Sequence, residues 1–190
     1  VKLPSNTDFA AGACLGIPAL TAWQACVTDG GISGQTVLVT GGAGAVGHYA
    51  VQIAKLKGAK QVIATVSSDA KAAHAKAGGA DATVNYKTEN VGERIKALTG
   101  GHGADRIIET NLSGNIALYP QILADYGLAV CYGSDEQQVP LMFGAMLGGN
   151  VGFRFFIVYR QTPEMRAQAV REINGYLEAG RLQHAVGRRV

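Results

Sequence analysis

Three glycines, Gly42, Gly44 and Gly47, lie between a run of β-branched residues and a helical pattern. Their Gly-x-Gly-x-x-Gly spacing is that of the loop that binds the pyrophosphate of a dinucleotide. In such a loop the first glycine permits a tight turn, the second lets the backbone approach the phosphates, and the third allows close packing of helix on strand. The first amides of the following helix are free to bind an anion. We therefore predict a pyrophosphate site, with a simple glycine turn as the alternative.

Two other glycine-rich nucleotide motifs are excluded by the neighbouring residues. A Walker loop has Lys and then Ser or Thr directly after its last glycine, whereas His48 and Tyr49 follow Gly47. The short-chain dehydrogenase pattern TGxxxGxG requires glycine where this chain has Ala45. That family also requires a tyrosine with a lysine four residues later, and no tyrosine of this sequence has one.

The end of the second predicted strand bears on which dinucleotide binds. Enzymes that use NAD place an Asp or Glu there, and its carboxylate accepts the ribose hydroxyls. In this chain Ser67 and Ser68 follow the strand, and Lys71 lies one helical turn further on. Hydroxyl groups and a cation suit a 2′-phosphate, which a carboxylate would repel. Asp69 fits the first turn of a helix. We predict a preference for NADP(H), with Lys71 as an ordinary solvated helix residue as the alternative.

Short β-rich runs alternate with helical patterns along the chain. The predicted strands are residues 36–40, 61–66, 82–85, 106–110, 128–132 and 151–156. Apolar spacing and caps predict helices at 44–57, 69–77, 89–98 and 113–124, the last starting at Ser113, and from Thr162-Pro163 to Gly180. Strict alternation implies parallel pairing through right-handed crossovers. We therefore predict an α/β fold, a Rossmann doubly wound six-stranded parallel sheet with helices on both faces and a ligand beyond the carboxyl ends of the strands.

We expect one dinucleotide-binding domain over residues 1–190. Residues 1–33 form a helical lead-in, 34–160 the Rossmann core, and 161–190 a C-terminal helix with a truncated return strand that includes Arg188-Arg189. The chain opens on Val1 without a methionine and stops at Val190, which suggests a piece of a longer protein.

Composition narrows the classes of partner and compartment. With 17 basic and 14 acidic residues, the net charge of +3 is too weak to favour nucleic acid as a partner. Three cysteines without metal-ligand spacing favour reduced thiols inside a cell. No apolar run reaches the roughly 18 residues of a membrane span, and no secretory signal opens the chain. We expect a cytoplasmic protein without a membrane or nucleic-acid partner.

Several short segments stand in an order that is more specific than any one motif. They are Gly16-Ile17-Pro18, Thr21-Ala22-Trp23, Val37-Leu38-Val39-Thr40-Gly41-Gly42-Ala43-Gly44-Ala45-Val46-Gly47, Gln52-Ile53-Ala54-Lys55, Gly78-Gly79-Ala80-Asp81, Val84-Asn85-Tyr86, Gly103-Ala104-Asp105 and Gly133-Ser134. Through them the chain resembles, over essentially its whole length, the zinc-independent quinone oxidoreductases of the medium-chain dehydrogenase/reductase superfamily, the group that includes ζ-crystallin. Many members have alanine in place of Gly42, so this loop is closer to the general Rossmann pattern.

The resemblance implies a role for several residues around a bound NADP(H). The pyrophosphate would lie on Ala43, Gly44, Ala45 and Val46, and the adenosine 2′-phosphate would lie among Ser68, Lys71 and Tyr86. The nicotinamide ribose would lie against Asn111, Gly133 and Ser134, with the carboxamide at the backbone of Phe156 and the nicotinamide near Thr21. Two alternatives stay open: Tyr86 could simply flank the third strand, and Thr21 could be a core residue that bonds back to its own helix.

The resemblance also implies that no catalytic zinc is present. Zinc-dependent alcohol dehydrogenases have a metal-binding cysteine four residues before the threonine that corresponds to Thr21, and this chain has Ile17 there. An aliphatic side chain cannot bind Zn²⁺. The four histidines are interpreted as isolated and mostly surface positions: His48, His74, His102 and His184.

Without a Lewis acid, the chemistry that fits is transfer of a hydride or electrons from NADPH to a quinone or an α,β-unsaturated carbonyl, with the cofactor carrying the reactivity. No catalytic residue can be named from the sequence. Glu109 stands at the end of a strand, and we interpret its carboxylate as a cap for a neighbouring loop rather than as a proton donor.

Full-length relatives have a barrel-like catalytic domain that is absent from this chain, and they pair through their sixth strand. We therefore expect a homodimer through residues 151–156, which contain three phenylalanines that would resist exposure on a monomer. Two alternative functions stay open. One is an enoyl-thioester reductase of the same superfamily, which would share every residue named above. The other is a nucleotide-binding relative with a structural or RNA-binding role, which the weak net charge does not favour.

Overall fold

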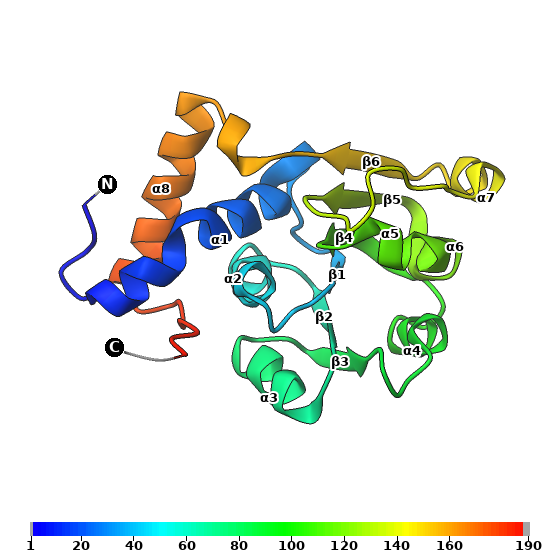
Figure 1. Cartoon of the computed structure of the whole chain (residues 1–190), viewed down its shortest axis with the longest axis horizontal. Helices are drawn as coiled ribbons and strands as arrows, with labels where there is room; N and C mark the ends of the chain where they lie inside the picture. Colours follow the sequence, from blue (N-terminus) through cyan, green and yellow to red (C-terminus); the bar gives the residue numbers. More distant parts are fainter. Residues whose placement is uncertain (1, 188–190) are drawn as a thin grey trace.

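Six strands form one parallel sheet in the order β3-β2-β1-β4-β5-β6 (Figure 1). The structure is a computed structural model that describes residues 2–187. The strands are β1 (Thr36–Val39), β2 (Gln61–Val66), β3 (Ala82–Asn85), β4 (Ala104–Glu109), β5 (Leu123–Cys131) and β6 (Gly152–Phe155). The order reverses between β1 and β4, as in a doubly wound sheet, where ligands bind outside the carboxyl ends of the strands. The predicted Rossmann fold is confirmed.

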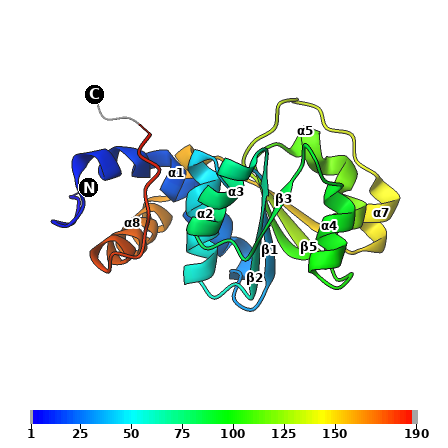
Figure 2. The same cartoon turned by 90° about the horizontal axis from the view of Figure 1, so that it is seen from below.

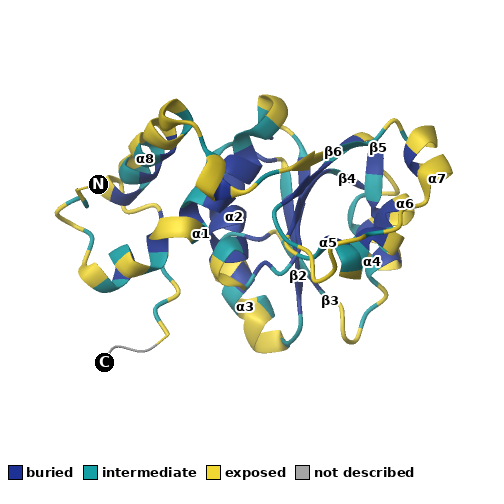
Figure 3. Ribbon diagram, turned by 45° about the horizontal axis from the view of Figure 1, so that its top comes forward, coloured by how far each residue is buried: buried dark blue, intermediate teal, exposed yellow. Residues whose placement is uncertain are grey.

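Helices cover both faces of this sheet (Figure 1, Figure 2). One face carries α2 (Ala45–Leu56) and α3 (Asp69–Ala77), together with α1 (Phe9–Val27) and α8 (Pro163–Glu178). The other face carries α4 (Val91–Leu98), α5 (Leu112–Asn115) and α6 (Tyr119–Ile122), while α7 (Phe143–Gly148) lies toward the β5 and β6 side. Short 3₁₀ turns are η1 (Thr28–Gly30), η2 (Ile116–Leu118) and η3 (Val158–Arg160). The outer surfaces of α3, α7 and α8 are exposed, whereas the central strands are buried (Figure 3).

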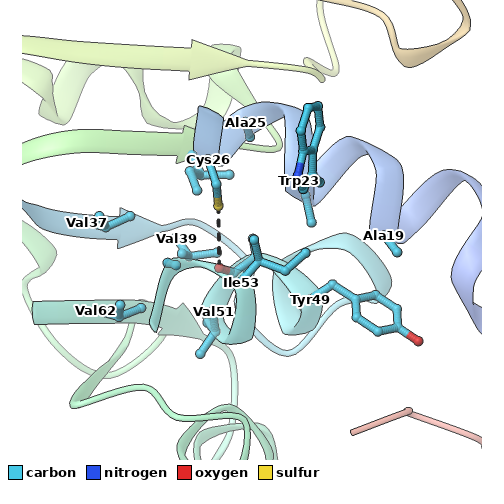
Figure 4. Packing of buried hydrophobic residues seen from close by; sticks show 14 of the residues in the cluster. Ala19, Trp23, Ala25, Cys26, Val37, Val39, Tyr49, Val51, Ile53 and Val62 are labelled. Atoms are coloured by element: carbon cyan, nitrogen blue, oxygen red, sulfur yellow. Dashed lines mark hydrogen bonds between the residues drawn. The ribbon is translucent and has the colours of Figure 1, made fainter. Parts of the chain in front are cut away.

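The larger part of the core lies between the sheet and helices α1 and α2 (Figure 4). Residues 37–39 of β1 are fully buried because helices cover both faces of a parallel sheet. Helix α2 is buried without interruption from residue 47 to residue 54, since it lies between the sheet and α1. Cys26 of α1 reaches across to α2, where its Sγ donates to the carbonyl of Ala50 at 3.9 Å. This packing fixes the start of α2 against the end of β1.

Helix α1 occupies most of the segment expected as a helical lead-in, and it contains a kink. The kink is at Gly16, with φ 9° and ψ −121°, two residues before Pro18. Proline has no N–H and its ring crowds the preceding turn, so a regular helix cannot pass through it. Beyond the kink, Trp23 Nε1 donates to Glu172 Oε2 of α8 at 2.9 Å. The C-terminal half of α1 is thereby joined to α8.

The expectation that no run is long and apolar enough to span a membrane is wrong. The segment Phe9–Gly30 meets that test by length and composition, because an 18-residue window within it has a mean hydropathy of 1.4. Half of that window is buried inside the protein, where α1 packs against α2 and α8. The apolar composition of α1 is therefore that of a helix packed in a core.

The segment between β4 and β5 differs from its prediction. The single helix expected at 113–124 is broken into α5, η2 and α6, because Pro120 near the start of α6 cannot continue a helical hydrogen-bond ladder. The N-cap of α5 is Asn111 rather than Ser113. Strand β5 begins at Leu123 instead of residue 128, with an irregular register opposite β4 between Ala104 and Arg106. Its first half has the sequence of a turn.

Two further differences lie toward the C-terminus. Helix α7 was not predicted, and residues 181–187 form no strand. The expected return-strand residues Arg188-Arg189 lie outside the described residues. The predicted start of the last helix is confirmed, because Thr162 Oγ1 accepts from the N–H of Met165 at 3.2 Å.

Candidate functional site

The loop between β1 and α2 turns at Gly41, which has a φ of +64°. Gly42 is the second residue of this tight turn, which the Gly44 N–H closes by donating to the carbonyl of Gly41 at 2.9 Å. Gly42 also lies against β2, where a Cβ atom would stand 2.5 Å from the Cβ of Ala64. The Gly42 N–H donates to the carbonyl of Thr65 at 3.0 Å. Gly42 is thus required by the close approach of the loop to the neighbouring strand.

The third glycine of the motif packs as the spacing predicts. A Cβ atom on Gly47 would overlap the carbonyl oxygen of Gly41, so the start of α2 lies directly on the loop. Gly44 is the N-cap of α2, with extended backbone and no side chain to cap the helix. Gly44 and Ala45 are exposed. The amides of the first turn have no partner within their helix, so this end of α2 is open to an anion.

A cavity of about 650 Å³ lies beside this loop, at the carboxyl ends of β1, β2 and β4. It is lined by Leu38, Thr40, Gly41, Thr65, Tyr86, Glu89, Asn90, Val91, Thr110, Asn111, Gly114, Asn115, Leu118 and Ile122. This is the position at which doubly wound sheets bind ligands. Its size is that of a small-molecule site. Of the residues predicted to contact the cofactor, Tyr86 and Asn111 line it directly.

The predicted 2′-phosphate patch is assembled at the start of α3. Lys71 Nζ donates to Ser67 Oγ at 2.9 Å, and Ser68 Oγ caps the helix by accepting from the Lys71 N–H at 3.3 Å. No ion pair to Lys71 is found within residues 2–187. Tyr86, 52% exposed, lines the cavity. The cation, both hydroxyls and the aromatic ring thus stand near the ends of β2 and β3.

The loops after β4 and β5 are joined through polar side chains. Asn111 Nδ2 donates to Asp135 Oδ2 at 2.6 Å, and Asn111 Oδ1 accepts from Ser113 Oγ and from the Asp135 N–H, each at 3.0 Å. Ser134 Oγ accepts from the Ser113 N–H at 3.3 Å. A Cβ atom on Gly133 would overlap the carbonyl oxygen of Thr110. The three residues predicted for the nicotinamide ribose are therefore neighbours.

The remaining two predicted residues do not line the cavity. Thr21 is buried in α1, at 4% exposure. Phe156 is half-buried beyond β6, where its N–H donates to the carbonyl of Cys131 at 3.2 Å and its ring centroid lies 6.2 Å from that of Tyr132. Neither Thr21 nor Phe156 is among the residues that line the cavity, so their contact with a nicotinamide is a proposal.

Sequence reasoning missed a set of threonines at the ends of strands. Thr65 Oγ1 accepts from the Gly41 N–H at 3.0 Å, and Thr40 Oγ1 accepts from the Thr110 N–H at 2.9 Å. The Thr65 hydroxyl thus joins β2 to the loop after β1, and the Thr40 hydroxyl joins the end of β1 to the loop after β4. All three threonines line the cavity. Each of them stands in the last two residues of a predicted strand, and that shared position was the available signal.

The interpretation of His48 as a surface histidine is wrong. Its side chain is 1% exposed and stacks on His74, with ring centroids 4.0 Å apart. Burial and the neighbouring His74 lower the pKa of His48 to about 4. The His48 ring is therefore neutral near pH 7 and packs between α2 and α3.

Residues 2–187 hold no group of three or more His, Cys, Asp or Glu placed to bind a metal ion. The groups that do converge at the carboxyl edge of the sheet are backbone amides, hydroxyls, a lysine and side-chain amides. Such groups are suited to phosphates and sugar hydroxyls.

This sheet, loop and cavity define a dinucleotide-binding α/β domain. The chain matches the family model described as zinc-binding dehydrogenase over residues 45–175, and it belongs to that family. Its relatives place it in the zinc-independent quinone oxidoreductase branch of the medium-chain dehydrogenase/reductase superfamily, a family of oxidoreductase enzymes. The sequence-based family assignment is confirmed.

Individual relatives support this placement. The chain is 33% identical to prostaglandin reductase 1 of Bos taurus over 180 residues, which cover 90% of this chain and 54% of that protein. It is 34% identical to quinone oxidoreductase of Homo sapiens over 134 residues, covering 70% of this chain and 40% of that protein. The Escherichia coli quinone oxidoreductase complexed with NADPH superposes with a TM-score of 0.85 at 25% identity, covering 96% of this chain and 57% of that chain. The chain spans about half the length of the curated relatives it matches.

Proposed function

We propose that this chain is the NADPH-binding part of an oxidoreductase that reduces quinones or α,β-unsaturated carbonyls. The observation that carries the proposal is the group formed by Ser67, Ser68 and Lys71 at the end of β2, where NAD enzymes have a carboxylate. When bound, NADPH would supply the hydride. The names of the relatives, which include quinone oxidoreductases and a prostaglandin reductase, support the two acceptor classes. A cytoplasmic location is part of this proposal, and imaging of the tagged protein would test it.

In this proposal each part of the cofactor has its own residues. The pyrophosphate lies on residues 43–46 and the first-turn amides of α2, and the 2′-phosphate lies among Ser67, Ser68, Lys71 and Tyr86. The nicotinamide half lies toward Asn111, Gly133 and Ser134, with Thr21 and Phe156 near the ring. The cradle fits because Gly44 is exposed at the start of α2, while Gly42 and Gly47 let the loop pack closely on β2 and on α2. The chain's own groups would bind and orient the cofactor.

The preference for NADPH is tested by titrating the chain with NADPH and NADH and following nucleotide fluorescence. We expect Lys71→Met to weaken NADPH binding about tenfold and to leave NADH binding nearly unchanged, because only NADPH has a phosphate for the lost cation. Lys76→Met, in the same helix with an exposed side chain, is the matched control and should change neither affinity. Equal wild-type affinity for NADPH and NADH, or no binding of either, would contradict the proposal.

The same proposal includes a homodimer through β6. Among residues 2–187 this strand pairs with β5 alone, so its other edge has no strand beside it in that part of the chain. The side chain of Phe155 is 64% exposed on that strand. We expect the wild type to sediment as a dimer and Phe155→Asp to sediment as a monomer. Phe9→Asp, at the far end of α1, should leave the dimer intact (Figure 1), and a monomeric wild type at all concentrations would refute this part.

A further inference from the structure

Glu109, the last residue of β4, has a side chain that is fully buried. Its Oε1 accepts from the Asn111 N–H at 2.6 Å, from Thr40 Oγ1 at 2.8 Å and from Asn115 Nδ2 at 2.9 Å. Its Oε2 accepts from the Tyr119 hydroxyl at 3.0 Å. Burial and the adjacent Glu109 raise the pKa of Tyr119, so that its hydroxyl keeps its proton and donates. The interpretation of Glu109 as a loop cap is confirmed.

No lysine or arginine pairs with Glu109 within the described part of the chain. A carboxyl group away from water is costly unless hydrogen bonds replace its hydration. Four donors from four different segments supply them here. Such an arrangement is more than a single loop cap requires, because the backbone N–H of Asn111 alone would satisfy that role.

Three of these four donors belong to residues that line the cavity: Thr40, Asn111 and Asn115. The N–H groups of Asn111 and Asn115 can only donate, so Oε1 must act as their acceptor. Thr40 Oγ1 in turn accepts from the Thr110 N–H at 2.9 Å. A single carboxyl oxygen therefore holds together the end of β1, the turn after β4 and helix α5. Glu109 itself does not line the cavity.

We propose that Glu109 is a positioning residue for nucleotide binding: its Oε1 acceptor holds Thr40, Asn111 and Asn115 in the arrangement that admits the nucleotide. This inference rests on the proposed function. Without the acceptor, the two N–H groups would be left unpaired in a partly buried site, and the turn would shift until they reached water. The conformation that can bind the nucleotide then becomes a minor state of the protein. The apparent affinity falls in proportion to the fraction of molecules that remain in that conformation.

A matched pair of variants isolates the acceptor. Glu109→Gln keeps the side-chain length, an oxygen that can accept at Oε1, and an N–H₂ that can donate to the Tyr119 oxygen. Glu109→Met has a similar length and no comparable acceptor. We expect Glu109→Gln to bind NADPH within about threefold of the wild type, and Glu109→Met to bind it at least about tenfold more weakly. Rescue by the amide is not expected of a residue that merely fills space.

Leu177→Ala is the control for an effect of lower stability alone. It leaves a cavity under α8, on the face of the sheet opposite to the one that carries α5 and α6. It should lower the free energy of unfolding and leave the affinity for NADPH unchanged. The inference is overturned if Glu109→Met binds NADPH as the wild type does, or if Glu109→Gln loses as much affinity as Glu109→Met.

A second measurement needs no nucleotide. Hydrogen exchange at the Asn111 amide, followed by NMR, should accelerate about tenfold in Glu109→Met and stay near the wild-type rate in Glu109→Gln. Equal exchange in both variants would overturn the assignment of Oε1 as the group that orders the turn. If the wild type binds neither NADPH nor NADH, the proposed function fails, and the exchange rates still decide whether Glu109 holds the turn.

Discussion

We expect Gly47→Ala to abolish NADPH binding and to lower the free energy of unfolding by about 3–5 kcal/mol, because the added methyl group would meet backbone that cannot move aside. The new Cβ atom would overlap the carbonyl oxygen of Gly41 and stand 2.9 Å from both the Gly41 carbonyl carbon and the Gly42 Cα. Relief requires that α2 move away from the loop. Such a movement displaces the amides proposed to bind the pyrophosphate and opens the packing of α2 on the sheet.

Urea unfolding and NADPH titration measure the two effects separately. The matched control is Gly175→Ala in α8, where nothing lies within 4 Å of the added Cβ atom. That variant should stabilise the chain by about 0.5–1 kcal/mol, since alanine is the better helix former. A Gly47→Ala protein with wild-type stability and affinity would show that the loop tolerates a side chain, and the pyrophosphate assignment would lose its structural basis.

Arg106→Met should destabilise the chain by about 3–5 kcal/mol. Arg106 is 2% exposed and lies in β4 beneath the end of α1. Its guanidinium donates to three backbone carbonyls, those of Ala25 at 3.3 Å, Thr28 at 2.7 Å and Gly31 at 2.9 Å. These carbonyls are at or beyond the C-terminal end of α1, where the helix dipole favours a cation. Methionine fills the volume and leaves all three unpaired.

The matched control is Arg154→Met, which removes an exposed arginine in place of a buried one. Arg154 forms an ion pair with Asp29 at 2.9 Å, and both side chains are exposed to solvent. Exposed pairs contribute about 0–1 kcal/mol, so chemical denaturation should show a small loss. Arg106→Lys should fall between the two, because an ammonium group cannot reach three carbonyls in a planar fork. Similar losses for Arg106→Met and Arg154→Met would show that the carbonyl contacts of Arg106 contribute little.

The sequence was sufficient for features whose cause is local. The strands β1 and β2 are runs of β-branched and apolar residues, and α2 has unbroken apolar spacing after a glycine loop. Thr162-Pro163 places the start of α8 because a capping hydroxyl and a first-turn proline act within a few residues. The contacts among Ser67, Ser68 and Lys71 are local for the same reason, since the three residues lie within five positions.

Features that depend on distant residues were missed. Thr40 and Thr65 have no local signature, and they acquire a role only when the strand order brings their hydroxyls to loops from other strands. The first half of β5 contains Tyr126, whose φ of +59° is unusual in a strand, and it was not predicted as part of a strand. Its pairing with β4 is non-local. His48 was misassigned because burial by α3 is not visible in the spacing of α2.

The bond between Trp23 and Glu172 bears on how the chain is made. The two residues are 149 positions apart, and Asn6 similarly donates to the carbonyl of Leu177, 171 positions away, at 2.9 Å. During synthesis α1 emerges before the six strands, whereas α8 follows them. Contacts of such sequence separation form slowly, and an apolar helix without its partner exposes surface that favours aggregation. The nascent chain must therefore keep one side of α1 uncovered until α8 has left the ribosome.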